Sequence, residues 1–433
     1  MNQDNLALNL DRMCGLLAAG ANRNGKSVGL ELERFLIDRS GRTVPYEGER
    51  GVAALLGKMA DGRPANELVE VDGHLMGLSY AVETKLGSVP VTVSLEPAAQ
   101  IEASVGPAPS AQALYLALEA FDRDVKDALG ELGLDAHLVA RGYNPTASSP
   151  LDLELIPKER YRNMDAYLSR RGRFARDMMR ATASTQVSLD YADEADAMGL
   201  MRRAVVLGPV FAFLFDNAPV FRGVPSPGMA RSRIWREMDP DRCGTVPGSL
   251  DDDFDFRAYA KWVSGVKPIL FTDRDHVTTP TGDRTAADVM AAEKLTDGEL
   301  AHLMSMVFPN VRLKGFLEYR EMDALPPRLA AACAWIVAGI LYHPERLGEL
   351  PFRIDDQTEE SVERARAGLE ESGWEARPYG APIADTAQAL LGIAEGSVEG
   401  EFDRKSLELL RDMWLNERSL PRDLAYERLA TLS

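Results

Sequence analysis

Cysteine and histidine are both scarce in this chain of 433 residues, which contains three cysteines and five histidines. Cys14, Cys243 and Cys333 are odd in number and far apart, so they match neither a disulfide framework nor the Cys-x-x-Cys pairs of a structural zinc site. The histidines show no His-Glu-x-x-His or comparable ligand spacing. These absences argue against a disulfide-stabilised fold and against a zinc centre.

Long apolar segments are also lacking. The longest apolar stretch, residues 329–341, is about half the length needed to cross a bilayer, so we expect a buried core helix there. The first five residues, Met-Asn-Gln-Asp-Asn, contain an acid where a signal peptide has basic residues, and no apolar region follows them. The sequence therefore predicts a cytoplasmic protein without a membrane partner.

The chain also lacks an excess of basic residues. The chain has 67 acidic and 49 basic side chains and a formal net charge of −18. Nucleic-acid binding depends on clustered Lys and Arg that neutralise phosphates, so a nucleic-acid partner is excluded. The hydrophobic content of 45% and charged content of 27% are those of a globular protein rather than a disordered one. Solubility alone would explain the charge, which leaves open whether all of these carboxylates lie on the surface.

Short alternating segments, which predict strands, are separated by longer segments with helical periodicity. Beyond residue 350 only charged amphipathic helices are expected, and no Ser/Gly-rich linker precedes them. We expect an α+β core over residues 1–350 and a helical C-terminal region, 351–433, packed on it. The predicted helices cover residues 6–18, 51–60, 111–131, 192–215, 258–263, 329–341, 357–372, 383–394, 404–416 and 421–431.

Alternation of apolar and polar residues gives the main functional signal, because it places every second side chain on the same face of a strand. Glu31, Glu33, Glu96 and Glu102 all fall on the polar faces of their segments. An antiparallel sheet with one solvated face explains this pattern without any function. The alternating segments are 28–37, 89–96, 100–103, 182–191 and 311–320.

Two physical arguments favour a functional interpretation of these glutamates. Glutamate is depleted in strands, and like charges crowded on one sheet face repel each other at a cost that bound cations relieve. Oxygen ligands without Cys or His suit Mg²⁺ or Mn²⁺ rather than zinc. Segment 311–320 adds Glu318 as another ligand, and Arg312, Lys314 and Arg320 as phosphate contacts. Carboxylates, a divalent metal and basic residues together indicate phosphoryl chemistry on a nucleotide.

Residues 20–27, Gly-Ala-Asn-Arg-Asn-Gly-Lys-Ser, match the phosphate-loop pattern Gly-x-x-x-x-Gly-Lys-Ser/Thr. That loop cradles phosphate only where a strand leads into it and a helix follows. Here the predicted helix at 6–18 comes first and the predicted strand at 28–37 follows. We interpret the segment as a helix C-cap and turn, not as a nucleotide site.

A basic and aromatic cluster follows the proline-rich loop 219–227. It consists of Arg231, Arg233 and Arg236 with Trp235 among them. From the residues alone, this cluster is either a structural anchor for the loop or an arginine clamp for a substrate carboxylate.

Several blocks, taken together and in order, resemble the glutamate–cysteine ligases of plants and bacteria. The first two are Val-Gly-Leu-Glu-Leu-Glu-Arg-Phe at 28–35 and Ser-Leu-Glu-Pro-Ala-Ala-Gln-Ile-Glu-Ala-Ser at 94–104. The resemblance continues at 160–164, 177–190, 231–235, 239–244 and 312–320.

The resemblance implies a glutamine-synthetase-like α+β fold, in which a curved antiparallel sheet forms a funnel flanked by helices. It also implies ATP-dependent joining of the glutamate γ-carboxylate to the amine of cysteine. Arg320 and, less directly, Lys314 would contact the ATP phosphates, and Arg231 and Trp235 would bind glutamate. The divalent metals, Mg²⁺ or Mn²⁺, would be held by Glu31, Glu33, Glu96, Glu102, Gln186 and Glu318.

The chain departs from the family pattern at several positions. Ala98 and Ala99 replace two glycines, Ser188 stands where an asparagine is typical, and Glu321 and Met322 interrupt an Arg-Gly-Ala-Asp ending. These departures leave two alternatives: a related ligase that joins glutamate to a different amine, and a catalytically silent homologue that binds ATP and metal. The sequence is compatible with a monomer or a homodimer.

Overall fold

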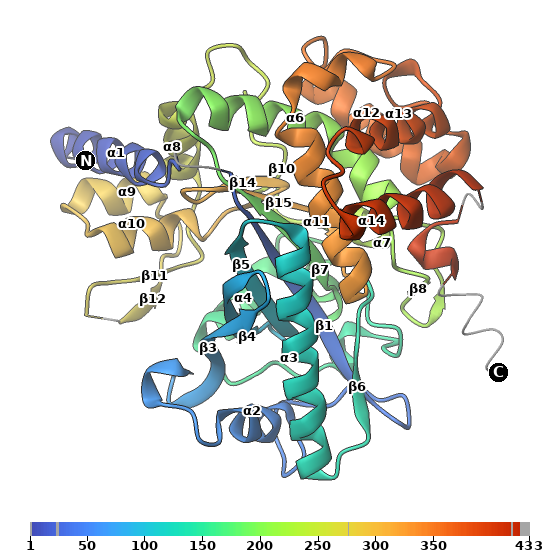
Figure 1. Ribbon diagram of the computed structural model, residues 1–433. Helices are drawn as coiled ribbons and strands as arrows, with labels where there is room; N and C mark the ends of the chain where they lie inside the picture. Colours follow the sequence, from blue (N-terminus) through green and yellow to red (C-terminus); the bar gives the residue numbers. More distant parts are fainter. Residues whose placement is uncertain (1, 23–25, 276, 417–418, 425–433) are drawn as a thin grey trace.

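The computed structural model describes residues 2–22, 26–275, 277–416 and 419–424. Within them the expected α+β class is confirmed: a nine-stranded antiparallel sheet, not closed into a barrel, is flanked by helices (Figure 1). The strand order is β14-β15-β7-β1-β5-β4-β3-β2, and β6 pairs with the end of β1. The strands are β1 (Val28–Asp38), β2 (Leu68–Val71), β3 (His74–Thr84), β4 (Gly87–Leu95), β5 (Ile101–Ala108), β6 (Ala136–Val139), β7 (Ser184–Leu189), β14 (Val311–Leu313) and β15 (Leu317–Asp323).

Nine of the predicted helices are confirmed, and their ends shift by up to three residues. The exception is the segment expected at 404–416, where the α-helix ends at Arg411 and a π-helical turn follows. The tenth, expected at 421–431, lies outside the described residues beyond position 424. The α-helices are α1 (Gln3–Ala19), α2 (Val52–Ala60), α3 (Ala111–Leu132), α4 (Glu159–Leu168), α5 (Ala175–Ala181), α6 (Glu194–Leu214), α7 (Ala230–Arg236), α8 (Phe256–Gly265), α9 (Ala286–Ala292), α10 (Asp297–Met304), α11 (Pro327–Leu341), α12 (Glu359–Ser372), α13 (Ile383–Glu395) and α14 (Glu401–Arg411).

Short elements complete the chain. Paired strands outside the large sheet are β8 (Val220–Phe221) with β9 (Val224–Pro225), β10 (Cys243–Gly244) with β13 (Phe308–Pro309), and β11 (Leu270–Thr272) with β12 (Thr278–Pro280). The 3₁₀ segments are η1 (Ala65–Glu67), η2 (Pro150–Asp152), η3 (Pro344–Glu349), η4 (Gly373–Glu375) and η5 (Pro378–Gly380), and η6 (Asp412–Asn416) is the π-helical turn after α14.

The apolar face of the sheet is covered by helices. α3 runs across β3, β4 and β5, α11 packs on β1 and β7, and α6 packs on β15 (Figure 1). α6 is the one helix in the described part of the chain that is long and apolar enough to cross a membrane, but 78% of its most apolar window is buried inside the protein. It therefore has the burial of a core helix.

The C-terminal helices pack on the core without an intervening linker. α12 lies against α6, while α13 and α14 lie against α11 (Figure 1). This arrangement brings α12 beside the end of the sheet that holds β15. The division of the chain at residue 350 into two regions stays a prediction.

The segment expected as one strand at 311–320 is instead a hairpin, so that expectation is wrong. β14 and β15 pair antiparallel, with Arg312 directly opposite Glu318. Gly315 makes the turn with a φ of +91°, in the left-handed region where glycine carries no steric cost. Apolar and charged residues keep alternating through the turn, because both strands of the hairpin present their charged residues to the same face. The sequence pattern therefore gives no sign of the turn.

At residues 20–27, which match the phosphate-loop pattern, a helix comes before the segment and a strand comes after it, as predicted. α1 ends at Ala19 with Gly20 as its C-cap, and β1 begins at Val28, while residues 23–25 lie outside the described residues. A Cβ built on Gly20 would lie 2.0 Å from the carbonyl oxygen of Gly315. The glycine therefore allows the end of α1 to approach the β14–β15 hairpin backbone.

The hairpin turn generates the first prediction. Gly315→Ala should lower the free energy of unfolding by about 1–3 kcal/mol, since alanine at a φ of +91° is strained even though the Cβ has room. Gly298→Ala is the matched control, because Gly298 lies in α10 with no atom within 4 Å of the added Cβ and should be neutral or slightly stabilising. Urea unfolding of both variants measures this, and equal stabilities would contradict the strained turn.

Candidate active site

The polar face of the sheet forms the floor of a cavity of about 290 Å³. The antiparallel register brings the predicted acidic residues together, with Glu31 opposite Gln186 of β7 and Glu33 opposite Glu102 of β5. α4 and α5 supply further wall residues. Of the predicted site residues, those lining this cavity are Glu31, Glu33, Glu96, Glu102, Gln186, Arg231, Trp235, Arg312, Lys314 and Arg320.

Glu33 and Glu102 are held by hydrogen bonds. Glu33 accepts from the backbone N–H and the hydroxyl of Ser184, both at 2.8 Å, and from Nε2 of Gln186 at 2.9 Å. Glu102 accepts from the hydroxyls of Ser94 at 2.7 Å and Ser104 at 3.2 Å. These donors fix two carboxylates that would otherwise repel each other directly across the β1–β5 ladder.

The pKa values of Glu31 and Glu96 are both raised. Burial, followed by the charges of Glu318 and Glu102, raises the pKa of Glu31 from 4.5 to about 8. Burial, followed by the charges of Glu102 and Glu33, raises the pKa of Glu96 to about 8. Both side chains are partly accessible to the cavity but lie deep beneath the molecular surface. Near pH 7 these two carboxyls hold protons in the folded protein.

Glu318 is completely buried and meets three cations. Its oxygens accept from Arg312 Nε and Nη2 at 2.5 and 2.9 Å, Lys314 Nζ at 2.8 Å and Arg320 Nη1 at 3.1 Å. Burial opposes ionisation, but Arg312, Arg320 and Lys314 together hold the pKa of Glu318 well below its ordinary value. Glu318 is therefore held in its ionised form.

The fit of a divalent metal depends on the chemistry and the spacing of these groups. The donors are the carboxylate and amide oxygens of a cavity that also contains basic side chains, and oxygen donors of this kind suit Mg²⁺ or Mn²⁺. In the described part of the chain, no group of three or more His, Cys, Asp or Glu side chains is arranged to hold a metal ion. The donor set fits the metal chemically, and its side chains would have to converge further to coordinate one.

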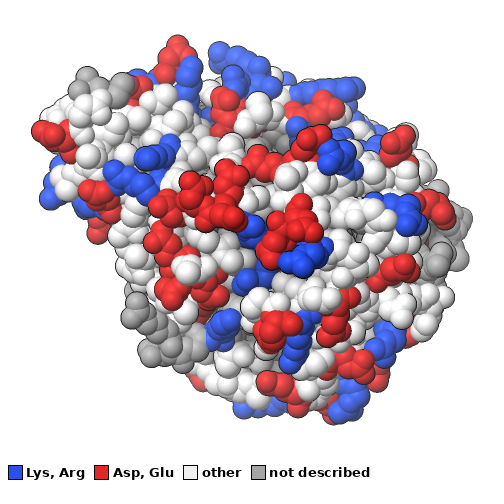
Figure 2. Space-filling view, turned by 90° about the horizontal axis from the view of Figure 1, so that it is seen from above, with Lys and Arg blue, Asp and Glu red and all other residues white. Residues whose placement is uncertain are grey.

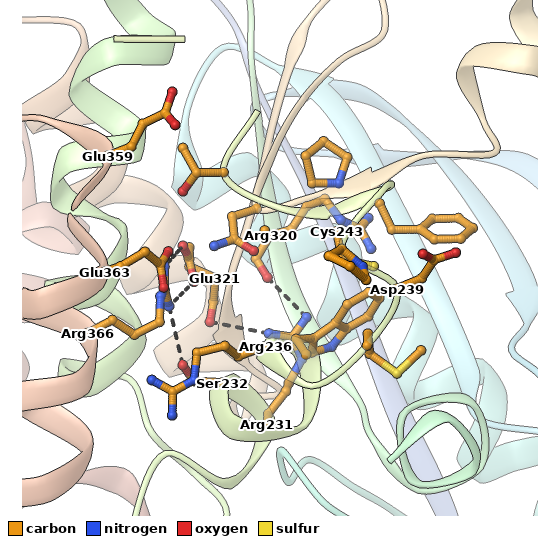
Figure 3. Close-up of a pocket in the computed structure, with 18 of the residues that line it drawn as sticks. Arg231, Ser232, Arg236, Asp239, Cys243, Arg320, Glu321, Glu359, Glu363 and Arg366 are labelled. Carbon is orange, nitrogen blue, oxygen red and sulfur yellow. Dashed lines mark hydrogen bonds and ion pairs between the residues drawn. The ribbon is translucent and has the colours of Figure 1, made fainter. Parts of the chain in front are cut away.

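A second cavity, of about 460 Å³, adjoins the first (Figure 3). Arg231, Trp235, Phe308 and Arg320 line both cavities and so form the boundary between them. Its other walls come from α7, from the segment around β10, and from the first two turns of α12. The lining mixes arginine and glutamate side chains.

Arg231 and Trp235 present unpaired donors at the boundary between the cavities. Arg231 donates from Nη2 to the carbonyl of Arg320 at 3.0 Å and from Nη1 to the carbonyl of Glu321 at 3.3 Å. Its Nε and the indole Nε1 of Trp235 are buried with no hydrogen-bond partner. The Trp235 ring lies 5.7 Å from the Arg231 guanidinium and 5.8 Å from that of Arg320. Buried orphan donors beside two guanidiniums form a ready anion-binding position.

Two basic residues near Glu96 were missed by the sequence reasoning. Arg160 lines the acidic cavity, and Lys158 lies over the ring of Tyr161 at 4.7 Å. Burial lowers the pKa of Lys158, and the charge of Glu96 opposes this. Arg160 falls within a block that carried the family resemblance, whereas no sequence pattern marks Lys158. Arg312, expected to contact phosphate, lines the same cavity and donates to Glu318 and to the carbonyl of Val307, so its phosphate role stays a prediction.

The turn that carries Glu96 departs from the family pattern without losing its shape. Ala99 has a φ of +63°, a left-handed conformation that alanine adopts only at a steric cost. Gln100 stabilises the turn, since its Oε1 accepts from the Ala98 N–H at 2.8 Å and its Nε2 donates to the carbonyl of Thr182 at 3.1 Å. Gln100 therefore lines the cavity as a bracing residue of the turn.

The two adjoining cavities of this α+β fold bring carboxylates and arginine side chains together. A model of the glutamate-cysteine ligase family 2 matches residues 27–389, and the chain belongs to that family. This confirms the resemblance found in the sequence.

The chain is similar to plant relatives over most of its length. It is 29% identical to the chloroplastic glutamate–cysteine ligase of Medicago truncatula, over 88% of this chain and 74% of the relative. It is 27% identical to glutamate–cysteine ligase B, chloroplastic, of Oryza sativa subsp. japonica (90% and 77%) and to the chloroplastic enzyme of Arabidopsis thaliana (90% and 74%). These chloroplastic relatives contradict the cytoplasmic localisation expected from the N-terminus, and that expectation is withdrawn.

The raised pKa values of Glu31 and Glu96 generate a prediction about stability. Glu31 and Glu96 bind protons in the folded state that the unfolded chain releases, so their contribution to stability is present at low pH and is lost as pH rises through about 8. The Tm of the metal-free protein should fall between about pH 4.5 and about pH 8 and level off at higher pH, and Mg²⁺ should reduce that fall by offsetting the ionised carboxylates.

A Glu31→Gln/Glu96→Gln variant is the control for this prediction, because glutamine is neutral throughout and should flatten the pH dependence. Differential scanning calorimetry across the pH series measures the slopes. The same slope in the variant and the parent protein would show that other groups cause the effect.

Proposed function

We propose that the protein joins the γ-carboxylate of glutamate to the amine of cysteine, consuming ATP and giving γ-glutamylcysteine, ADP and phosphate. The observation that carries this proposal is the junction of the two cavities, where the orphan donors of Arg231 and Trp235 lie beside a carboxylate-lined chamber. Family membership supports the same reaction. A site of this kind can hold an amino-acid carboxylate and nucleotide phosphates side by side.

In this mechanism Arg231 and Trp235 bind the α-carboxylate of glutamate. Two N–H groups of Arg231 bind the β15 backbone and hold the guanidinium plane, so its unpartnered Nε–H has a fixed direction. The Trp235 N–H adds a second donor at the same boundary. Two fixed donors orient the glutamate so that its γ-carboxylate points into the acidic chamber.

Arg320 and Lys314 serve as the phosphate-binding residues of the catalytic site. Both side chains line the cavity on the sheet, and each forms an ion pair with the carboxylate of Glu318. Glu31, Glu33, Glu96, Glu102, Gln186 and Glu318 would hold the divalent cations, which when bound supply positive charge between the carboxylates and the ATP phosphates. Mg²⁺ or Mn²⁺ suits these oxygen donors.

The reaction itself proceeds in two transfers. A γ-carboxylate oxygen of glutamate attacks the γ-phosphorus of ATP, ADP leaves, and a γ-glutamyl phosphate is formed. The cysteine nitrogen then attacks the acyl carbon, inorganic phosphate leaves, and the amine loses a proton. Because two anions must meet in the first step, the main contributions of Arg320 and Lys314 are positioning and charge stabilisation.

An amine screen tests the proposed reaction directly. ADP release should require glutamate and should be largest with cysteine among small amines and amino acids. Larger release with another amine would favour a related carboxylate–amine ligase. Binding of Mg²⁺ and ATP without turnover on any amine would favour a catalytically silent homologue.

Substitution of the acidic residues tests the metal assignment. Glu31→Gln and Glu318→Gln should each abolish ligation, a loss of at least about 100-fold, because glutamine cannot provide the carboxylate that a bound cation requires at the nucleotide site. Circular dichroism verifies that both variants fold. Glu408→Gln on the exposed face of α14 is the matched control and should keep full activity. Near-normal turnover of either site variant would overturn the assignment of that residue.

Substitution of Arg231 tests the glutamate site. Arg231→Lys keeps the charge but cannot span both β15 carbonyls and still reach a carboxylate, so the KM for glutamate should rise about 10-fold or more. The KM for ATP should change little. Arg39→Lys, at an exposed position, is the control. Equal changes in both KM values would argue against a specific glutamate contact.

A further inference from the structure

A buried ion pair joins the C-terminal helices to the strand that carries Arg320. Arg366 of α12 donates from Nη1 to Oε2 of Glu321 at 3.0 Å and from Nη2 to Oε1 at 2.6 Å (Figure 3). The two side chains are only 4% and 5% exposed. This is a bidentate pair of the kind that fixes geometry as well as charge.

The surroundings of the pair are shaped to hold it. A Cβ on Gly208 of α6 would lie 2.5 Å from Oε1 of Glu321, so glycine at this position makes room for the carboxylate. Arg366 also donates to the hydroxyl of Ser232 at 3.3 Å, and that hydroxyl donates to Glu370 at 3.0 Å. α12 is thereby connected both to β15 and to α7.

Each contact of Arg366 is one residue away from a proposed substrate-binding side chain. Glu321 follows Arg320 in β15, and Ser232 follows Arg231 in α7. Arg231 itself donates to the carbonyls of both Arg320 and Glu321. Arg366 therefore braces, from outside, the backbone on which both substrate arginines are positioned (Figure 3).

The energetics favour a role in positioning over one in stability. Burying two charges removes much of their hydration, so a buried ion pair contributes little more stability than apolar side chains of similar size. Its specific effect is to impose one arrangement on the groups it connects. Here those groups are β15, α7 and α12, which meet at the wall of the larger cavity.

We propose that Arg366 and Glu321 are positioning residues for glutamate binding, through which the C-terminal helices set the orientation of Arg231 on the carbonyls of Arg320 and Glu321. This inference rests on the proposed function, because it takes the α-carboxylate of an acidic amino acid as the ligand of Arg231. Neither residue touches substrate in this scheme. Both act through the backbone and side chains of their neighbours.

The test replaces both charges together. The double variant Glu321→Met/Arg366→Met removes the pair without leaving a lone buried charge, and it should remain folded with a Tm close to that of the parent protein. We expect the KM for glutamate to rise about 10-fold or more while the KM for ATP stays within about twofold, because the altered backbone bears on Arg231 most directly.

Two further variants keep the outcome decisive. Glu401→Met/Lys405→Met removes an exposed ion pair of the same C-terminal region and should leave both KM values unchanged. Arg366→Lys keeps the charge but loses the bidentate contact, and it should show an intermediate rise in the KM for glutamate. Arg366→Lys also tests the positioning role if the double methionine variant fails to fold.

The results separate this inference from the proposed function. If the parent protein shows no glutamate-dependent ADP release, the proposed function falls, and the positioning role falls with it. If the parent protein is active but the folded variants keep the parent KM for glutamate, only the positioning role is overturned. A lowered Tm with equal changes in both KM values would assign the pair a purely structural role.

Discussion

Repulsion between buried carboxylates is the constraint on which the rest of the site depends. Glu33 and Glu102 stand opposite each other in the β1–β5 ladder, with Glu31 and Glu96 nearby on the same face. Such a set is tolerated only if protons, hydrogen-bond donors or cations offset its charge. All three are present. Protons are retained at Glu31 and Glu96, whose pKa values are raised. Serine and glutamine donors bind Glu33 and Glu102, and three basic side chains bind Glu318.

The same constraint brings acidic and basic side chains together in both cavities. Glu96 and the glutamates of β1 and β5 face lysine and arginine side chains in the cavity on the sheet, and the larger cavity combines arginines with the glutamates of α12. At the molecular surface, acidic and basic side chains are interspersed on the face seen in Figure 2, without one continuous basic area. The net charge of the whole chain therefore says little about its ligands, while the local pairing of charges inside the cavities says much more.

The sequence predicted the features that depend on local periodicity. Alternation placed Glu31, Glu33, Glu96 and Glu102 on one face, and helical periodicity located nine helices. It failed where geometry depends on residues distant in the chain. The pairing of Arg312 with Glu318 required a turn at Gly315 that the alternation concealed. Neither Lys158 beside Glu96 nor Arg366 on Glu321 follows any periodic pattern, because tertiary packing alone brings those partners together.

The close fit of Gly208 against Glu321 has an evolutionary consequence. A side chain at position 208 would collide with the carboxylate, and a carboxylate at 321 without Arg366 would be a lone buried charge. Substitutions at these three positions are therefore epistatic, since the effect of each depends on which residues already occupy the other two. Glutamate at 321 is tolerated only with glycine at 208 and a cation at 366, and the buried cation at 366 in turn needs the carboxylate at 321.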